Sequence, residues 1–211
     1  MTDGLKQYHL LQDRIPGLTN ANCWAHARRD YADAIKVADK ADAAAVKRSV
    51  SYQALSRIAL IYELEGALKE LSPEQRLQER QENIRPLVEE YFTWVKKQLA
   101  DTTVPPKGKT AEGLKYSVNQ EEYLKVFLTD GNVPIDNSAS ERSIRTFCVG
   151  KKNWMFHDSV KGAQASAVIY SLSETAKLNN LRPYYYFKHL LTELPKLRDE
   201  KGNVEKHAAK I

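Results

Sequence analysis

The segment from Asp136 to Lys152 combines carboxylates and cations at spacings that suit a helix. Glu141 and Arg145 are four positions apart and therefore share one helical face. Magnesium prefers carboxylate oxygens together with substrate phosphate oxygens, so a carboxylate backed by cations and followed by a basic loop could hold a divalent metal against a phosphodiester. The ordinary alternative is a helix with an Asp cap and an exposed Glu–Arg pair, which this segment alone favours.

A second segment places Cys23, His26, Arg28 and Arg29 close together. A thiol and an imidazole are zinc ligands, but two ligands without a second pair elsewhere form only a weak zinc motif. A buried thiol and a hydrogen-bonded histidine are therefore the favoured interpretation. The two arginines could contact phosphate or could line the solvated side of a helix, and the segment leaves both alternatives open.

Composition limits the class of protein. A chain of 211 residues can bury a core of its own, and its formal net charge of +5 permits a polyanionic partner without requiring one. The two cysteines are too far apart to predict a disulfide framework or a zinc ribbon. The sequence has neither a signal-like start nor an apolar run long enough to cross a membrane. We therefore expect a protein of the reducing cytoplasm with no membrane partner.

Charge is unevenly distributed along the chain. Between Ile61 and Ala100, eight acidic residues face six Lys and Arg, which predicts a solvated acidic surface. Between Glu141 and Lys161 the balance reverses, with five Lys and Arg against two acidic residues. The basic character of the chain is thus concentrated next to Glu141.

Helical periodicity dominates the elements that must position these side chains. Ser72, Pro73 and Gln75 form a capping box with proline at the first helical position, and Pro86 should kink or divide the helix that follows. Residues 101–109 should be a loop, and Asp136 or Asn137 should cap a helix. The expected helices cover residues 3–12, 24–45, 55–64, a stretch starting at 72, 84–99, a stretch starting at 119, 136–147, 162–178 and a stretch starting at 183. The expected extended pieces are residues 15–23 and 133–135.

Five motifs follow one another along the chain. They are Thr2-Asp3-Gly4 with Tyr8; Cys23-Trp24-Ala25-His26-Ala27-Arg28-Arg29; Gly131 through Arg145, with Ile135-Asp136-Asn137 and Glu141-Arg142; Gly150-Lys151-Lys152-Asn153-Trp154 with Phe156; and Ser171 through Asn179. In this order, up to about Pro195, the chain resembles the transposase family of insertion sequence sixty-six. Five ordered motifs are far more specific than any one of them.

The resemblance implies a DDE catalytic site in a ribonuclease-H-like domain. It makes Asp3 the second acid of the triad and Glu141 the terminal one, with Asp136 as the competitor for the role of Glu141 and a further candidate metal ligand. Two Mg²⁺ or Mn²⁺ ions would bind in the complete enzyme. The residues implied to contact the DNA backbone are Arg28, Arg29, Arg142, Arg145, Lys151 and Lys152.

The resemblance also implies partners and a location. The partners would be DNA, as transposon ends and target, and a second copy of the chain or a full-length transposase. The location would be the bacterial cytoplasm, at the nucleoid. Where the family usually has Asn after Asp136-Asn137, this chain has Ser138, and Lys151 replaces an arginine that could bind phosphate in bidentate fashion.

The expected fold class is mainly α: a partial ribonuclease-H-like (α/β) domain with an all-helical insertion and a C-terminal helical element. Asp3 and Glu141 are 138 positions apart, which implies the insertion. The expected divisions are 1–48 and 130–160 for the core, 49–129 for the insertion, and 161–211 for the C-terminal element and charged tail. Several strands of the parent sheet should be missing.

The resemblance places the first catalytic Asp of the family upstream of the Asp3 motif. We therefore expect the chain to be a transposase fragment that is inactive alone. The alternative is a non-catalytic product that binds DNA or full-length transposase as a regulator. A helical interaction domain with chance motifs ranks below both.

Overall fold

The computed structural model describes residues 1–37 and 43–197, apart from the side chains of residues 151–154. It divides into two compact units, Met1–Ala139 and Ser140–Ile211. In the described residues the regular structure is helical, and the β pairing is an isolated parallel bridge between Thr2 and Asn22. The mainly helical prediction is confirmed. The strand expected within residues 15–23 is reduced to this bridge.

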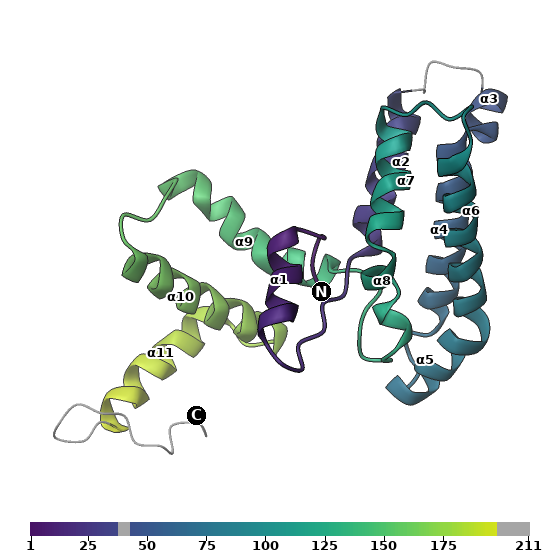
Figure 1. The fold of residues 1–211 in the computed structure, drawn as a ribbon. Helices are drawn as coiled ribbons and strands as arrows, with labels where there is room; N and C mark the ends of the chain where they lie inside the picture. Colours follow the sequence, from purple (N-terminus) through teal and green to yellow (C-terminus); the bar gives the residue numbers. More distant parts are fainter. Residues whose placement is uncertain (38–42, 198–211) are drawn as a thin grey trace. The chain divides into compact units, whose positions relative to one another are not determined.

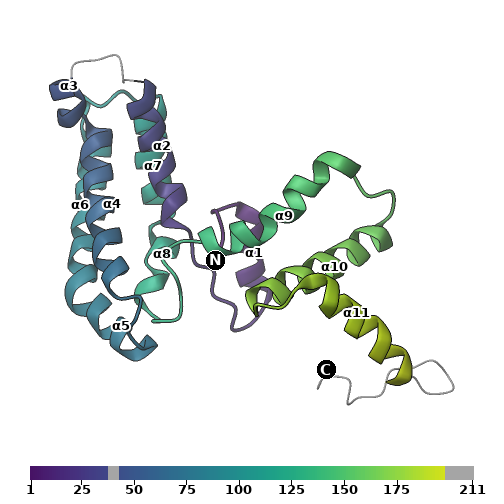
Figure 2. The same cartoon turned by 180° about the vertical axis from the view of Figure 1, so that it is seen from behind.

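Four helices of the first unit run side by side (Figure 1), and the view from behind shows the same grouping (Figure 2). They are α2 (Trp24–Val37), α4 (Val50–Ala67), α6 (Arg85–Ala100) and α7 (Lys109–Asn119). Helix α2 packs on α4 and α7, and α6 packs on the same two helices, so the four enclose one core. That core includes Trp24, Tyr31, Ile58, Ile61, Val88, Tyr91, Phe92, Val95, Leu114 and Phe127.

Shorter elements complete the first unit. They are α1 (Lys6–Arg14), α3 (Ala43–Arg48), α5 (Pro73–Glu79), a π-helical turn (Arg80–Ile84), α8 (Glu121–Leu124) and a 3₁₀ turn (Val126–Leu128). The helix expected over 24–45 is observed as α2 and α3, and residues 38–42 between them lie outside the described part.

Local signals placed the start of α5 correctly. The Ser72 hydroxyl accepts from the Gln75 amide at 3.3 Å, and the Gln75 side chain accepts from the Ser72 amide at 3.1 Å. This is the predicted capping box. The helical run from α5 to α6 is divided next to Pro86, as predicted, by the π-helical turn Arg80–Ile84. Pro86 itself lies in the first turn of α6, where no intrahelical N–H bond is needed.

Helix α7 was not predicted, although the loop before it was. Its buried positions include Gly113 and Ser117, so the apolar periodicity of the segment is weak. A Cβ on Gly113 would lie 2.8 Å from the Tyr31 ring, which shows how closely α7 approaches α2. The buried Ser117 hydroxyl contacts the Tyr31 and Tyr91 hydroxyls at 3.2 and 2.8 Å. Close packing and this polar network therefore replace an apolar stripe.

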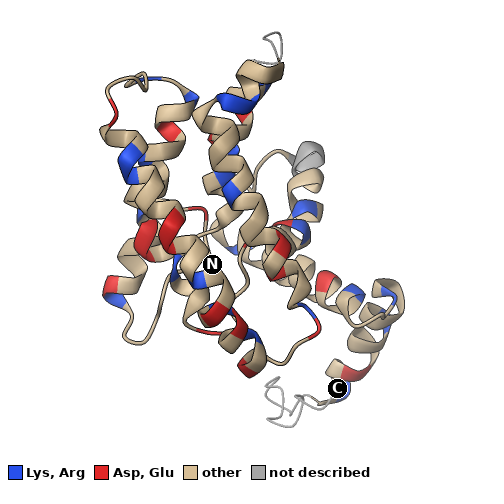
Figure 3. Cartoon of the chain, turned by 90° about the vertical axis from the view of Figure 1, so that its right-hand side faces the viewer, with Lys and Arg blue, Asp and Glu red and all other residues tan. Residues whose placement is uncertain are grey.

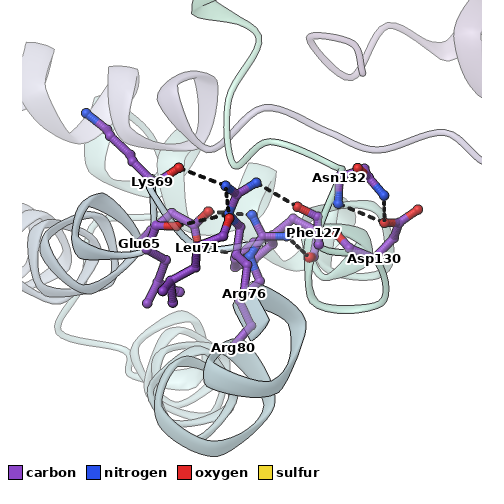
Figure 4. Close-up of polar contacts among 10 residues, drawn as sticks. Glu65, Lys69, Leu71, Arg76, Arg80, Phe127, Asp130 and Asn132 are labelled. Carbon is purple, nitrogen blue, oxygen red and sulfur yellow. Dashed lines mark hydrogen bonds and ion pairs between the residues drawn. The ribbon is translucent and has the colours of Figure 1, made fainter. Parts of the chain in front are cut away.

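A buried arginine ties the chain after α8 to the bundle (Figure 4). The Arg80 side chain is 1% exposed and pairs with Glu65 of α4. Its Nη1 also donates to the carbonyl oxygens of Phe127 and Asp130 at 2.7 and 2.8 Å. Sequence composition placed Arg80 on a solvated acidic surface. That expectation is wrong for this residue, because its partners are remote carbonyl groups that local composition does not reveal.

Arg76 and Gly131 fix the next part of the same loop. Arg76 donates to the carbonyl oxygens of Leu68, Leu71 and Gly131, each within 3.2 Å. A Cβ on Gly131 would lie 1.8 Å from the Pro73 carbonyl oxygen, so only glycine fits at this position. The chain that leads to Ile135 and Asp136 is thereby held against the start of α5.

The second unit contains three helices, α9 (Ser138–Trp154), α10 (Val160–Leu178) and α11 (Pro183–Glu193), and a final 3₁₀ turn (Leu194–Leu197). Helix α9 begins two residues before the unit boundary. The predicted starts of α9 and α11 are confirmed to within two residues. The basic loop expected at residues 150–154 is wrong, because α9 continues through it; a single Gly150 costs the helix only about 1 kcal/mol.

Few side chains of the second unit are buried. In its described part, Ala176 is the one buried residue, and the Phe147 and Tyr170 rings meet edge to face with centroids 5.1 Å apart. Apolar residues exposed by half or more include Ile144, Val149, Val160, Val168, Ile169, Leu178, Tyr184, Tyr185 and Leu191. Of the helices in residues 1–37 and 43–197, none has the length and apolar character needed to cross a bilayer.

Removing Glu65 should strongly destabilise the first unit. Glu65→Ala leaves the Arg80 guanidinium buried without its counter-charge, which costs about 3–5 kcal/mol. Urea unfolding followed by tryptophan fluorescence measures the change. Glu63→Ala, an exposed glutamate of the same helix, is the control and should stay within about 0.5 kcal/mol of wild type. Equal losses of stability in both variants would contradict a stabilising role for the buried pair of Arg80 and Glu65.

Candidate active site

Residues 20–24, the junction segment, join three distant parts of the first unit. The amide of Asn22 donates to the Tyr123 carbonyl at 3.0 Å, that of Cys23 to Thr2 at 3.0 Å, and that of Trp24 to Ile135 at 3.2 Å. Three successive amides thus donate to three separate segments. The junction segment therefore brings the Thr2-Asp3-Gly4 and Ile135-Asp136-Asn137 motifs to one place.

Buried amide side chains extend this junction. The Thr2 hydroxyl contacts the side-chain oxygens of Asn20 and Asn22 at 3.0 and 3.1 Å. Asn22 donates in turn to the Gln120 side chain at 2.7 Å. Asn20 and Asn22 are 6% and 1% exposed, so these bonds replace the water that both side chains lose on folding.

Asp3 is half-buried at the start of this network. Its Oδ1 accepts from the Leu5 amide at 3.2 Å, and its carbonyl oxygen accepts from the Tyr116 hydroxyl at 3.0 Å. In the described residues, Oδ2 accepts no hydrogen bond. Gly4 follows with φ of 87°, and a Cβ there would lie 2.9 Å from the Tyr116 hydroxyl. Asp3 is thus fixed through its backbone while one carboxylate oxygen remains available.

Asp136 lies at the start of α9 and has both carboxylate oxygens hydrogen-bonded. Oδ1 accepts from the Ser138 amide at 2.9 Å, and Oδ2 accepts from the Tyr62 hydroxyl of α4 at 3.2 Å. Burial and then the charge of Asp136 raise the pKa of Tyr62, so its phenol remains a donor. Asp136 therefore accepts from the first amide of α9 in an Asx turn just before the helix, at the place where a capping side chain was expected.

Glu141 and its neighbouring cations lie on α9. Glu141, Arg142 and Arg145 are all exposed there and belong to the second unit. Arg28 and Arg29 are exposed on α2 in the first unit. Lys151 and Lys152 lie within α9, but their side chains fall outside the described part. Along the bundle helices, Lys and Arg are interspersed with Asp and Glu (Figure 3).

The donor chemistry of Asp3 and Glu141 suits a hard divalent cation, since both are carboxylates on side chains that solvent reaches. Asp136 suits it less well, because a metal would compete with the Ser138 amide and the Tyr62 hydroxyl. Within the described residues, no three His, Cys, Asp or Glu side chains gather as a metal site.

Cys23 and His26 behave as the favoured interpretation expected. Cys23 is fully buried with a free thiol, and burial raises its pKa, which disfavours the thiolate that binds zinc. Its sulfur accepts from the Asn137 amide at 3.5 Å. His26 Nε2 contacts Arg29 at 3.0 Å. These residues support the junction.

Several supporting residues were not found by sequence reasoning. Tyr62 and Tyr116 reach the two aspartate motifs from the bundle helices, and Gln120 reaches Asn22 of the junction segment from the turn after α7. The partner of each residue is more than 70 positions away. No local pattern indicates such contacts.

Gly4→Ala, next to Asp3, should lower the free energy of unfolding more than the same substitution at another glycine with positive φ. The new methyl group would clash with the side chains of Tyr116 and Asn22, and alanine is also strained at the positive φ of this position. Gly17→Ala is the matched control, since its φ is 79° with open space around it. We expect a loss of stability of about 2–3 kcal/mol for Gly4→Ala and about 1 kcal/mol for Gly17→Ala, measured by urea unfolding. Equal losses of stability would show that the close contacts around Gly4 do not contribute to the effect.

Comparison with known proteins identifies the family. The model of the "Transposase IS66 family" matches residues 1–165, and that of the "IS66 C-terminal element" matches residues 171–202. Two uncharacterized proteins of Sinorhizobium fredii, y4hP and y4jD, are 32% and 29% identical over 84% and 91% of the chain.

The aligned part covers 32% of y4hP and 37% of y4jD, so the chain spans about a third of the length of these relatives. No solved structure matches it. The first family model covers most of the chain, including the junction segment and both aspartate motifs. The chain belongs to the IS66 family of transposases.

Proposed function

We propose that the chain forms part of a catalytic region that cleaves and joins DNA strands, with Asp3 and Glu141 as two acids of its metal site. The observation that carries the proposal is the junction segment, which holds two of the family motifs together through main-chain hydrogen bonds. Residues 1–48 and 130–160 would form the core, 49–129 an inserted helical region, and 161–211 the C-terminal element. The ribonuclease-H-like character of that core belongs to this proposal.

Each acid would have a distinct role. Asp3 would offer Oδ2 to a cation while the Leu5 amide keeps Oδ1 oriented. Asp136 would act chiefly by fixing the first turn of α9, the helix that carries Glu141. Bound at the two acids, Mg²⁺ or Mn²⁺ ions would supply Lewis-acid chemistry for in-line attack on phosphorus. Arg142 and Arg145, together with Arg28, Arg29, Lys151 and Lys152, would hold the DNA backbone.

The isolated chain should be a poor catalyst. The motifs assign two acids where the complete site is proposed to use three, and a metal held by fewer ligands binds more weakly. In the regulatory alternative, the chain makes the same DNA contacts but does not catalyse cleavage. The partners in both roles would be DNA and either a second copy of the chain or a full-length transposase.

Metal binding and nicking test the acids. We expect the purified chain to bind Mn²⁺ weakly, measured by loss of the free-ion electron paramagnetic resonance signal, and to nick supercoiled plasmid barely or not at all. Asp3→Asn and Glu141→Gln should each weaken Mn²⁺ binding further. The controls Asp13→Asn and Glu122→Gln remove exposed acids and should leave it unchanged.

Two results would revise this assignment. Mn²⁺ binding that survives both Asp3→Asn and Glu141→Gln would remove these residues from the site. Robust nicking by wild type that Glu141→Gln abolishes would keep the acid but contradict the inactivity of the isolated chain. Asp136→Ala tests the competing role, because it removes the oxygen that accepts from the Ser138 amide. A loss of stability with unchanged Mn²⁺ binding supports a role for Asp136 at the start of α9 and not as a metal ligand.

Arg142→Ala and Arg145→Ala test the DNA contact. Each variant should weaken binding to a 30-base-pair duplex and lower the salt dependence of log K by about one, since each removes one phosphate neutralisation. Fluorescence anisotropy over a salt series measures both quantities. Arg85→Ala, an exposed arginine of the bundle, should change neither. Unchanged salt slopes in both α9 variants would count against a backbone contact on that helix.

A further inference from the structure

A small pocket lies where α10 gives way to α11 in the second unit. Its volume is about 300 Å³, and its walls are Leu181, Arg182, Tyr185, Tyr186 and His189. This volume is at the lower end of the range for small-ligand pockets. Aromatic and cationic side chains dominate the lining, so the pocket differs in chemistry from the apolar groove between α9 and α10.

The turn that forms the pocket is well defined. Asn180 adopts φ of 57°, and the Leu181 amide donates to the Ala176 carbonyl at 2.8 Å. The Asn180 amide donates to Lys177 at 3.0 Å, which completes a Schellman ending of α10. Pro183 then starts α11 at once. Local structure therefore sets the backbone positions of Arg182 and Tyr185 on either side of Pro183.

The aromatic rings beside the pocket are open to solvent. Tyr184 and Tyr185 are 72% and 58% exposed, with ring centroids 5.3 Å apart in an edge-to-face arrangement. The Arg182 guanidinium lies over the Tyr185 ring, 5.3 Å from its centroid. Aromatic faces beside an arginine are the surface on which unpaired bases stack, and the cation can reach the adjoining phosphate.

Local charge favours a polyanion. The acids of α10 and α11 have lysine partners, Glu174 with Lys177 at 2.6 Å and Glu193 with Lys196 at 2.8 Å. In the described residues, Arg182 and Lys188 form no ion pair with an acid, and both are exposed. The surface around Tyr185 therefore carries positive charge that remains available to a phosphate.

We propose that this pocket binds a nucleotide of single-stranded DNA, with the base stacked against Tyr185 and its phosphate beside Arg182. The inference rests on the proposed function, because it takes DNA as the ligand. A duplex is a poorer fit, since its bases already stack on one another, whereas a single strand offers free base faces. The C-terminal element would then hold the strand that cleavage or strand displacement exposes.

The test compares single-stranded and duplex DNA bound to the full 211-residue chain. A labelled mixed-sequence 20-mer and its duplex are the probes, read by fluorescence anisotropy. Tyr185→Ala should weaken single-strand binding about 5- to 100-fold and leave duplex binding within twofold. Tyr185→Phe keeps the ring and should bind like wild type. Tyr52→Ala, an exposed tyrosine of α4, is the matched control and should have no effect.

Arg182→Ala separates the charge from the ring. It should lower the salt dependence of log K for the single strand by about 0.7, whereas Tyr185→Ala should leave that slope unchanged. Far-UV circular dichroism confirms that each variant retains its helices. Single-strand binding that Tyr185→Ala leaves intact overturns the inference, as does an equal loss for both probes.

Two further outcomes distinguish a failure of the proposed function from a failure of the pocket assignment alone. If the wild-type chain binds neither probe, the proposed DNA partner fails together with the pocket. If it binds both probes and Tyr185→Ala only converts a dimer to a monomer in sedimentation, the aromatic face is a contact between copies, and the pocket assignment alone is wrong.

Discussion

Three consecutive peptide groups carry the architecture of the first unit. The amides of Asn22, Cys23 and Trp24 donate, in that order, to carbonyls of α8, of the N-terminal segment and of the loop before α9. These residues are at most 1% exposed, and a buried peptide group that loses its partner costs about 1–3 kcal/mol. The Trp24 indole then donates to the Leu124 carbonyl at 2.8 Å and packs among the rings of the core. Bundle packing and the placement of Asp3 and Asp136 therefore depend on the same short stretch of chain.

Elements with a strong local signal could be predicted from the sequence, and elements set by remote contacts could not. The Ser72 capping box and the Pro183 start of α11 each depend on a few neighbouring residues, and both were correct. Helix α7 was missed because Gly113 fills a buried position that only the Tyr31 ring explains. The buried state of Arg80 was missed because its carbonyl partners lie 47 and 50 positions away.

The candidate site shows the same division. Asp3, Asp136 and Glu141 were found as members of ordered motifs, and their chemistry follows from residue type. The residues that hydrogen-bond to them could not be predicted, since Tyr62 is 74 positions from Asp136 and Tyr116 is 113 from Asp3. Residue type indicates which groups could bind a cation. The hydrogen bonds that orient these groups arise only when the bundle brings distant segments together.

The two thiols of the chain have opposite environments, and this gives the protein a built-in reporter. Cys148 is exposed, whereas Cys23 is 0% exposed beneath the segments that meet at the junction. An alkylating reagent would label Cys148 directly but would reach Cys23 only during moments when those segments separate. When reclosing is faster than labelling, the rate at Cys23 measures the free energy of that local opening. The integrity of the junction can thus be followed in the unmodified sequence, through the fraction of molecules in which the Cys23 sulfur is accessible.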